Sequence, residues 1–363
     1  MIEKAMIEEY GWDAERAAQF EACAGPGLVP GRVVRQARDL STLMTPLGEL
    51  AAEVSGRFRH EASGPADFPV IGDWAVVEPL GEGRGLIHAL LPRRSAFTRK
   101  VAGEAVEAQV AGANVDTVFL VSGLDGDFKL RRIERYLATA WSSGAAPVVV
   151  LNKTDLRPDL EAVIAQVEAV ALGVPVVAVS ALAEGGLAGL EPLLVPGRTI
   201  ALLGSSGVGK STLINRLLGE ERFRTSSMSD ATAGRGRHTT TTRELVRLPG
   251  GALLVDTPGM RELQLWSGEE SLDRAFGDIE ALAARCHFPD CRHEGEPGCA
   301  VRAAAEGGLL DGRRLESFLK LRREARFMEL KKDAKARRQK EKAAGREFAA
   351  RLKEVKRNKP RYQ

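Results

Sequence analysis

The sequence predicts a multidomain protein with an N-terminal β-barrel, a central α/β domain and a C-terminal α-helical domain that binds zinc. Three observations support this fold class. Short β-like runs separated by Gly, Pro and Asp fill residues 28–100, strands then alternate with helices up to Trp266, and three of four cysteines crowd into residues 286–299. A chain of 363 residues is also too long for one ordinary core, so several domains are expected.

Changes in composition along the chain place the domain boundaries. The breaker Gly25-Pro26-Gly27 ends a first segment, and a Lys- and Arg-rich run begins at Lys331. An OB-fold is one option for the barrel, although the strand pattern fits any small β-domain. We expect an N-terminal extension at 1–27, the barrel at 28–102, the α/β domain at 103–266, the zinc-binding helical domain at 267–330 and a basic tail at 331–363.

Within the α/β region, five apolar runs have the length of buried strands, and residues 128–143 have a helical pattern. Alternation of this kind is typical of a parallel sheet. The expected strands are Thr117–Val121, Pro147–Leu151, Pro175–Val179, Thr199–Leu203 and Ala252–Val255.

Whole-chain properties exclude some classes of protein. No apolar run approaches the roughly 20 residues that a membrane span needs, and the acidic N-terminus lacks the apolar region of a secretory signal. We therefore expect a cytoplasmic protein without membrane contact. Residues 331–363 hold 14 Lys and Arg against 4 Asp and Glu, a net charge of +10 in a chain of +3 overall. Such a tail is typical of proteins with a polyanionic partner, although it also fits a solvated helix.

The strongest motif follows the strand expected at Thr199–Leu203 and fits the pattern G-x-x-x-x-G-K-[ST] without a mismatch. Its glycines let backbone N–H groups surround phosphate oxygens at a helix N-terminus. Lys210 would contact the β- and γ-phosphates, and Ser211 would ligate Mg²⁺. The residues expected to bind nucleotide here are Gly204, Ser205, Ser206, Gly207, Val208, Gly209, Lys210, Ser211 and Thr212.

The motif Asn152-Lys153-Thr154-Asp155 indicates which nucleotide base is bound. It stands at the end of the strand expected at Pro147–Leu151. A carboxylate at Asp155 can accept two hydrogen bonds from guanine, whereas adenine has no 2-amino group to donate. Asn152 would contact N7, and the Lys153 stem would cover the base. Ser180 and Ala181 follow the next strand, where small residues let a backbone N–H approach guanine O6.

Two further segments predict a γ-phosphate switch. Asp256 ends a strand and can hold Mg²⁺ through water, and Gly259 can donate its N–H to the γ-phosphate. Before them lies a polar, Thr-rich loop that contains His238 and Thr239–Thr242. Thr240 is our choice for completing the Mg²⁺ shell.

The order of these motifs is unusual. In ordinary GTPases the phosphate-binding loop precedes the NKxD motif, whereas here residues 152–155 and 180–181 precede residues 204–211. All of them still follow strands, so one nucleotide site can form at the carboxyl edge of the sheet. The sequence therefore predicts a circularly permuted GTPase that binds GTP or GDP with Mg²⁺.

A second site is predicted by Cys286, Cys291, His293 and Cys299. Three thiolates and one imidazole suit a closed tetrahedral zinc site, which is structural rather than catalytic. Spacing alone leaves His287 open as a rival ligand.

Together these motifs resemble the circularly permuted, small-subunit-dependent GTPases of the RsgA/YjeQ family. The resemblance covers residues 28–330 and includes IGDWAVV, PRRSAFTRK, ANVDTVFLV, IERYLATA and CHFPDCRHEGEPGCAV. It implies an N-terminal OB-fold that binds RNA, one structural Zn²⁺ per chain, and His293 rather than His287 as fourth ligand. Residues 1–27 and the tail inherit no role from it.

The resemblance also implies a partner and an activity. The partner is the small (30S) ribosomal subunit with its 16S rRNA, late in assembly, and GTP hydrolysis is stimulated by that subunit. We expect a monomer that works beside other late assembly factors. Basic side chains in the tail and at Arg93, Arg94, Arg99 and Lys100 are candidates for phosphate contacts.

A missing residue suggests the mechanism. Many GTPases carry a glutamine after DxxG that orients the attacking water, but Met260 stands there in this chain. His238 is the best local replacement, and we hypothesise that RNA docking brings it to the water. Lys210, His238 and Thr240 are therefore the catalytic candidates. The alternative is that His238 is a loop residue without a role in catalysis.

Three other functions remain open from the sequence. The chain could be a GTP-binding assembly placeholder with negligible turnover, an ATP-dependent enzyme, or a zinc-dependent RNA-binding module with a decayed GTPase. Intact Lys210, Ser211 and Asp256 argue against the last.

Overall fold

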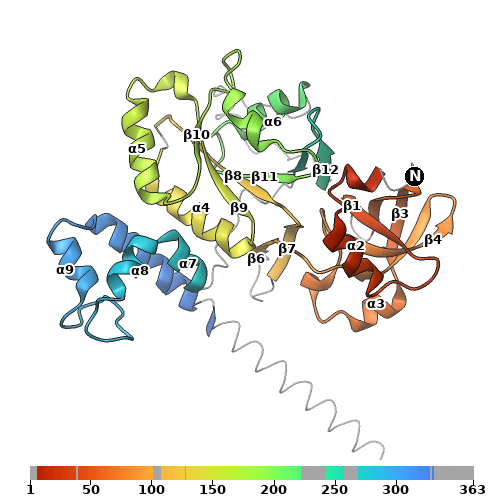
Figure 1. Ribbon diagram of the computed structural model, residues 1–363, viewed down its shortest axis with the longest axis horizontal. Coiled ribbons are helices and arrows are strands. Elements are labelled where there is room, and N and C mark those ends of the chain that lie inside the picture. The colour runs from red at the N-terminus through yellow and green to blue at the C-terminus, as the bar shows by residue number, and fades with distance from the viewer. Residues whose placement is uncertain are drawn as a thin grey trace, which may run out of the picture.

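The computed structural model describes residues 6–37, 40–100, 108–126, 128–221, 243–256, 269–327 and 329–330. Figure 1 shows three parts in a row: the N-terminal barrel, the central α/β domain and the C-terminal helices. This confirms the predicted fold class.

The N-terminal part is a closed five-stranded barrel. Its strands are β1 (Val29–Ala37), β2 (Leu40–Thr45), β3 (Gly48–Val54), β4 (Trp74–Gly81) and β5 (Arg84–Leu90). The order β1-β2-β3-β5-β4 closes because β4 also pairs with β1, and the short helix α3 (Gly56–Glu61) lies between β3 and β4. A five-stranded barrel of this kind is the OB-fold that the resemblance implied.

A β-hairpin connects the barrel to the α/β domain. Its strands β6 (Ala96–Lys100) and β7 (Ala108–Ala113) pair antiparallel, and Val110 packs with Val70 of the barrel. The domain boundary expected after residue 102 therefore lies between the two strands of this hairpin.

The central domain has the predicted parallel sheet, with order β10-β9-β8-β11-β13 and β12 added antiparallel. All five predicted strands are confirmed, and β12 was not predicted because its sequence RELVR carries charge at both ends. The strands are β8 (Thr117–Gly123), β9 (Ala146–Asn152), β10 (Val176–Ala178), β11 (Thr199–Leu203), β12 (Arg243–Arg247) and β13 (Leu253–Asp256).

Helices cover both faces of this sheet (Figure 1) because its strands are apolar on both sides. On one face, Val118 and Leu120 of β8 pack with helices α4 (Leu130–Ser143) and α5 (Leu160–Val170). On the other face, Phe119 and Val121 pack with α6 (Lys210–Leu218). Alternate residues of one strand thus enter two separate cores.

The barrel and the central sheet are hydrogen-bonded to each other. Strand β1 pairs with β12, with Arg35 opposite Glu244 and Gln36 opposite Arg243. The result is one continuous array of eleven strands. The orientation of the barrel is therefore fixed through backbone hydrogen bonds as well as side chains.

The N-terminal extension packs between these two parts. Ile7 is 1% exposed, and Trp12 meets Trp74 of the barrel with ring centroids 4.9 Å apart. Helix α2 (Ala14–Glu21) buries Arg16, whose guanidinium donates to Asn114 Oδ1 at 2.6 Å. Glu9 forms a 3.0 Å ion pair with Arg247 of β12. The described part of the extension is therefore an integral part of the fold.

The C-terminal part consists of α7 (Glu269–Ala275), α8 (Gly277–Ala283), α9 (Ala300–Glu306) and a helix at residues 312–327. A buried ion-pair network joins it to α4. Arg314 is bidentate to Asp278 at 2.7 Å and donates to Glu134 Oε1 of α4 at 2.9 Å. Nowhere in the described ranges is there a helix with the length and apolar character to cross a bilayer.

Candidate nucleotide and zinc sites

The phosphate-binding loop lies between β11 and α6, with α6 beginning at Lys210. Two of its glycines have left-handed backbone conformations, with φ of 83° at Gly207 and 97° at Gly209. A Cβ atom at Gly209 would lie 2.3 Å from the Asn152 amide nitrogen, so no larger residue fits there. The geometry of the loop thus explains why the sequence pattern has glycine at this position.

Lys210 lies inside this loop and is only 7% exposed. Its ammonium donates to the carbonyl oxygen of Gly204 at 2.7 Å and to that of Ser205. These bonds hold the charge at the centre of the curled loop, at the N-terminus of α6. An ammonium and a helix N-terminus in one place favour a bound anion.

Asn152 joins the three segments that were expected to form the nucleotide site. Its side chain is 1% exposed, Nδ2 donates to the Val208 carbonyl at 3.0 Å, and Oδ1 accepts from the Ala181 N–H at 3.1 Å. The amide therefore links the end of β9 to the phosphate-binding loop and to the loop after β10. Sequence reasoning expected Asn152 at the base and did not foresee this tie.

Asp155 is exposed at the same edge of the sheet. One carboxylate oxygen accepts a hydrogen bond from the Ser180 hydroxyl at 2.6 Å, and the Thr154 N–H donates to the Val179 carbonyl at 3.3 Å. These contacts hold the Asp155 carboxylate against Ser180, in the loop after β10.

We expect Asp155→Asn to weaken GTP binding at least about 100-fold and to favour xanthosine triphosphate, because the amide NH₂ donates where the guanine 2-amino group needs an acceptor and where xanthine has a carbonyl oxygen that can accept. Competition of both nucleotides against a fluorescent GDP analogue measures this. Asp159→Asn, which alters an exposed ion pair with Arg157, is the matched control. Unchanged preference in Asp155→Asn would show that Asp155 does not read the base.

The Mg²⁺ candidates are described only in part. Ser211 lies in the first turn of α6, and Asp256 ends β13, the neighbour of β11. A hydroxyl and a carboxylate are oxygen ligands of the kind that Mg²⁺ prefers. His238, Thr240, Gly259 and Met260 lie outside the described residues.

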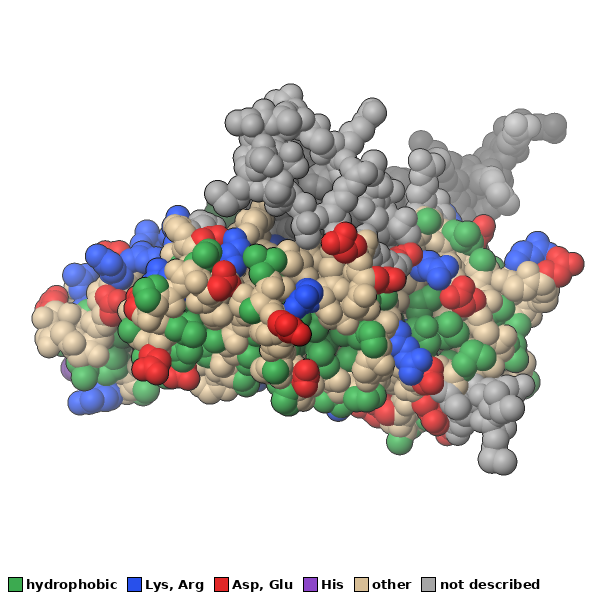
Figure 2. Space-filling view, turned by 90° about the horizontal axis from the view of Figure 1, so that it is seen from above, with side chains coloured by type: hydrophobic (Ala, Val, Ile, Leu, Met, Phe, Trp, Pro, Cys, Tyr) green, Lys and Arg blue, Asp and Glu red, His purple; other side chains and the backbone are tan. Residues whose placement is uncertain are grey.

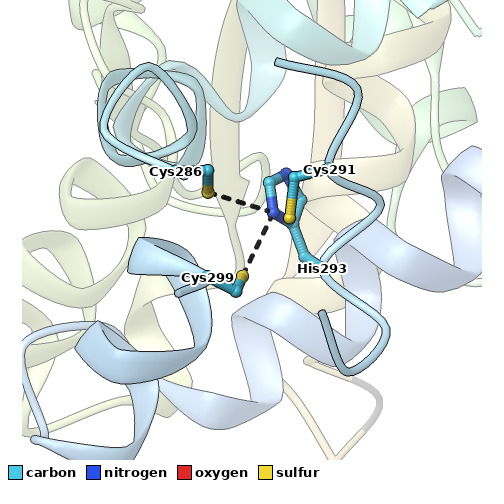
Figure 3. Close-up of side chains that lie close together, drawn as sticks. All are labelled: Cys286, Cys291, His293 and Cys299. Carbon is cyan, nitrogen blue, oxygen red and sulfur yellow. Dashed lines mark hydrogen bonds between the residues drawn. The ribbon is translucent and has the colours of Figure 1, made fainter. Parts of the chain in front are cut away.

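The four predicted zinc ligands converge (Figure 3). Their ligand atoms all lie within 4.8 Å of one another, and His293 Nδ1 is 3.7 Å from Cys286 Sγ and 3.4 Å from Cys299 Sγ. Zinc bonds of about 2.0–2.3 Å in a tetrahedron separate the ligand atoms by similar distances. The cluster therefore fits one structural zinc ion, with Nδ1 as the imidazole ligand.

Local backbone geometry places these ligands. His293 has a left-handed φ of 60°, and Cys299 is the N-cap of α9 and accepts from the Arg302 N–H. A thiolate at a helix N-terminus is stabilised by the helix dipole. His287 packs edge-on against Phe288 and is not a member of the cluster, which confirms the choice of His293.

Two arginines expected to meet RNA phosphates have other partners. Arg93 is bidentate to the fully buried Asp73 at 2.7 and 2.8 Å, and Arg94 pairs with Asp13 and Glu15. Burial raises the pKa of the Asp73 carboxyl, which opposes the lowering effect of Arg93. Both arginines take part in ion pairs within the fold, and their contact with RNA phosphates stays a prediction.

Comparisons with known proteins agree with this architecture. The RsgA GTPase family model matches residues 90–266. The chain is 52% identical over 328 residues to the small ribosomal subunit biogenesis GTPase RsgA of Opitutus terrae, covering 88% of this chain and 89% of that protein. It is 47% identical to the protein of the same name from Streptomyces avermitilis, over 87% of this chain and 84% of that one.

Two solved structures are similar as well. The crystal structure of YjeQ from Thermotoga maritima has a TM-score of 0.62 and 28% identity, over 82% of this chain and 98% of that one. YloQ, described as a circularly permuted GTPase, has a TM-score of 0.59 and covers 82% of this chain and 95% of that one. At 22% identity, YloQ supports the fold alone.

Proposed function

Because the chain belongs to the RsgA GTPase family, we propose that it hydrolyses GTP during late maturation of the small (30S) ribosomal subunit. It is a GTP hydrolase that uses GTP and Mg²⁺, releases GDP and phosphate, and holds one structural zinc ion. The subunit and its 16S rRNA are the proposed partners, and contact with them accelerates hydrolysis. We place this activity in a cytoplasmic monomer that works beside other late assembly factors.

One observation carries this proposal: Asn152 binds both the phosphate-binding loop and the loop after β10. Through this tie, a permuted chain assembles its base-reading and phosphate-binding segments at one sheet edge. The domain limits proposed above, at residues 28–102, 103–266 and 267–330, place this edge in the central domain.

We propose the following roles for the site residues. Bound Mg²⁺ neutralises the charge that develops on the phosphates. Lys210 and the loop N–H groups hold the phosphate oxygens, Asp155 reads the base, and Ser211 with Thr240 supplies oxygen ligands. His238 orients the attacking water in place of the glutamine that Met260 replaces.

The net charge of +10 in residues 331–363 supports an RNA partner. Lys and Arg side chains lie among Asp and Glu side chains at the end of the molecule formed by the C-terminal helices (Figure 2). The exposed arginines of this part are Arg274, Arg285, Arg292, Arg302, Arg313, Arg323 and Arg326, and the basic tail follows it in sequence. Affinity for the subunit should therefore fall steeply as salt rises.

Titration of GTP turnover with purified small subunits tests the proposed function. We expect a saturable increase in turnover with small subunits and none with large subunits. A chain that binds GTP but shows no stimulated turnover would instead be the assembly placeholder, and the hydrolytic role would be wrong.

The same assay tests His238. We expect His238→Ala to lower subunit-stimulated turnover by roughly 100-fold, since positioned acid–base groups contribute about that much, while nucleotide affinity stays unchanged. His60→Ala, at an exposed histidine of α3, is the matched control. Normal stimulation of His238→Ala would leave His238 as an ordinary loop residue.

A further inference from the structure

A carboxylate outside every recognised motif lies against the lysine of the NKTD motif. Asp125 follows β8, and its Oδ2 accepts from Lys153 Nζ at 2.5 Å. The same ammonium donates to the carbonyl oxygen of Gly207, in the phosphate-binding loop, at 2.7 Å. Lys153 is therefore held from two sides, by one residue after β8 and by one after β11.

Asp125 stands on a short loop that is itself fixed. The buried Leu124 donates its N–H to the Asn152 carbonyl at 2.8 Å, and the Asp125 carbonyl accepts from the Phe128 N–H at 3.1 Å. The loop after β8 is thus bonded to the residue immediately before Lys153. This backbone link places Asp125 and Lys153 on neighbouring segments of the chain.

Such contacts matter for Lys153 because its side chain would otherwise be free to move. Its φ is 67°, in the left-handed region that non-glycine residues seldom adopt. Its side chain is long and flexible, and 28% of it is exposed. Fixing a side chain of this kind on ligand binding costs conformational entropy unless it is already held in place.

We propose that Asp125 is a positioning residue for guanine-nucleotide binding, acting through Lys153. It anchors the ammonium so that the aliphatic stem is already in place to cover the base. This inference rests on the proposed function, in which residues 152–155 read guanine. The chemical class of ligand is a guanosine di- or triphosphate.

The competing explanation is an ordinary surface ion pair. Both side chains are partly exposed, and pairs of that kind contribute little to stability. The two explanations differ in how Asp125 and Lys153 depend on each other. If Asp125 acts only by holding Lys153, its carboxylate has no effect on affinity once the ammonium is removed.

A double-mutant cycle on the full chain, titrated with a fluorescent GDP analogue, tests the proposal. We expect Asp125→Asn to raise Kd roughly threefold to tenfold, the range that one immobilised side chain contributes. Asp125→Glu keeps the carboxylate and should restore most of the affinity. In the Lys153→Met background, which keeps an unbranched stem, Asp125→Asn should have no further effect.

Controls separate this role from general damage. Asp159→Asn removes a carboxylate from another exposed ion pair near the same sheet edge and should bind normally. An unchanged Kd in Asp125→Asn, or additive losses in the double variant, would overturn the proposal. If the unmodified chain fails to bind the analogue, guanine binding itself is wrong and the role of Asp125 falls with it.

Discussion

Replacing Cys299 with serine is expected to release zinc and unfold the C-terminal helices, residues 269–327. Cys299 is 6% exposed, lies beside His293 and caps α9, so its loss removes a ligand and a helix cap together. Structural zinc sites contribute about 10–16 kcal/mol of apparent binding free energy in small zinc-finger peptides near pH 7. Phe276 and Phe318 pack in an apolar core that this part shares with α4, and we expect this packing not to replace the contribution of zinc.

Zinc content per chain and limited proteolysis measure this effect. Cys23→Ser is the matched control, because Cys23 is an exposed free cysteine outside the cluster. We expect this control to keep one zinc ion and full protease resistance. Retention of both in Cys299→Ser would show that Cys286, Cys291 and His293 suffice, and that the fourth ligand is dispensable.

The second large effect is expected from Lys210→Ala. Lys210 is a buried ammonium at the centre of the phosphate-binding loop, and alanine removes both the charge and the bonds to Gly204 and Ser205. Loss of one preorganised donor to a developing charge costs about 100-fold to 1,000-fold in rate. We expect a fall of at least this size in single-turnover GTP hydrolysis, along with weaker nucleotide binding.

Lys320→Ala is the control for this variant, since Lys320 is an exposed lysine on the helix at 312–327. Thermal unfolding of both variants should stay close to that of the unmodified chain. Hydrolysis by Lys210→Ala at the normal rate would remove Lys210 from the catalytic machinery.

Most of the central fold was predictable because its signals are local. Buried parallel strands are continuous apolar runs, and the phosphate-binding loop needs glycine for conformational reasons that the sequence displays. Strand β12 was missed because its residues are charged at both ends and only its partners β1 and β13 stabilise it. Residues 243–247 therefore form a strand because of their neighbours in the assembled sheet.

The finer structure of the site depended on distant contacts. Nothing near Asn152 in the sequence indicates that its amide reaches Val208, which is 56 positions away. In the same way, Arg93 and Arg94 resemble a free basic pair until Asp73, Asp13 and Glu15 come beside them. The sequence therefore shows where basic residues occur. Their ion-pair partners in the folded protein decide which of these charges are already engaged.

The zinc site could be predicted from the sequence only in part. Spacing predicted the three cysteines, but it left His287 and His293 equivalent. The left-handed backbone at His293 turns its imidazole toward Cys286 and Cys299, whereas His287 packs on Phe288. The backbone conformation of His293 thus distinguishes it, as the zinc ligand, from His287.

The pairing of β1 with β12 has a consequence for how the protein behaves in a crowded cell. Because β4 closes the barrel onto β1, the described eleven-stranded array has a free strand only at β10. That strand is three residues long, Val176–Ala178, and offers an incoming chain very few hydrogen bonds. Exposed edges are where sheets recruit further strands and aggregate, and short edge strands are a known protection. Joining two domains into one sheet therefore also limits strand addition to this eleven-stranded array.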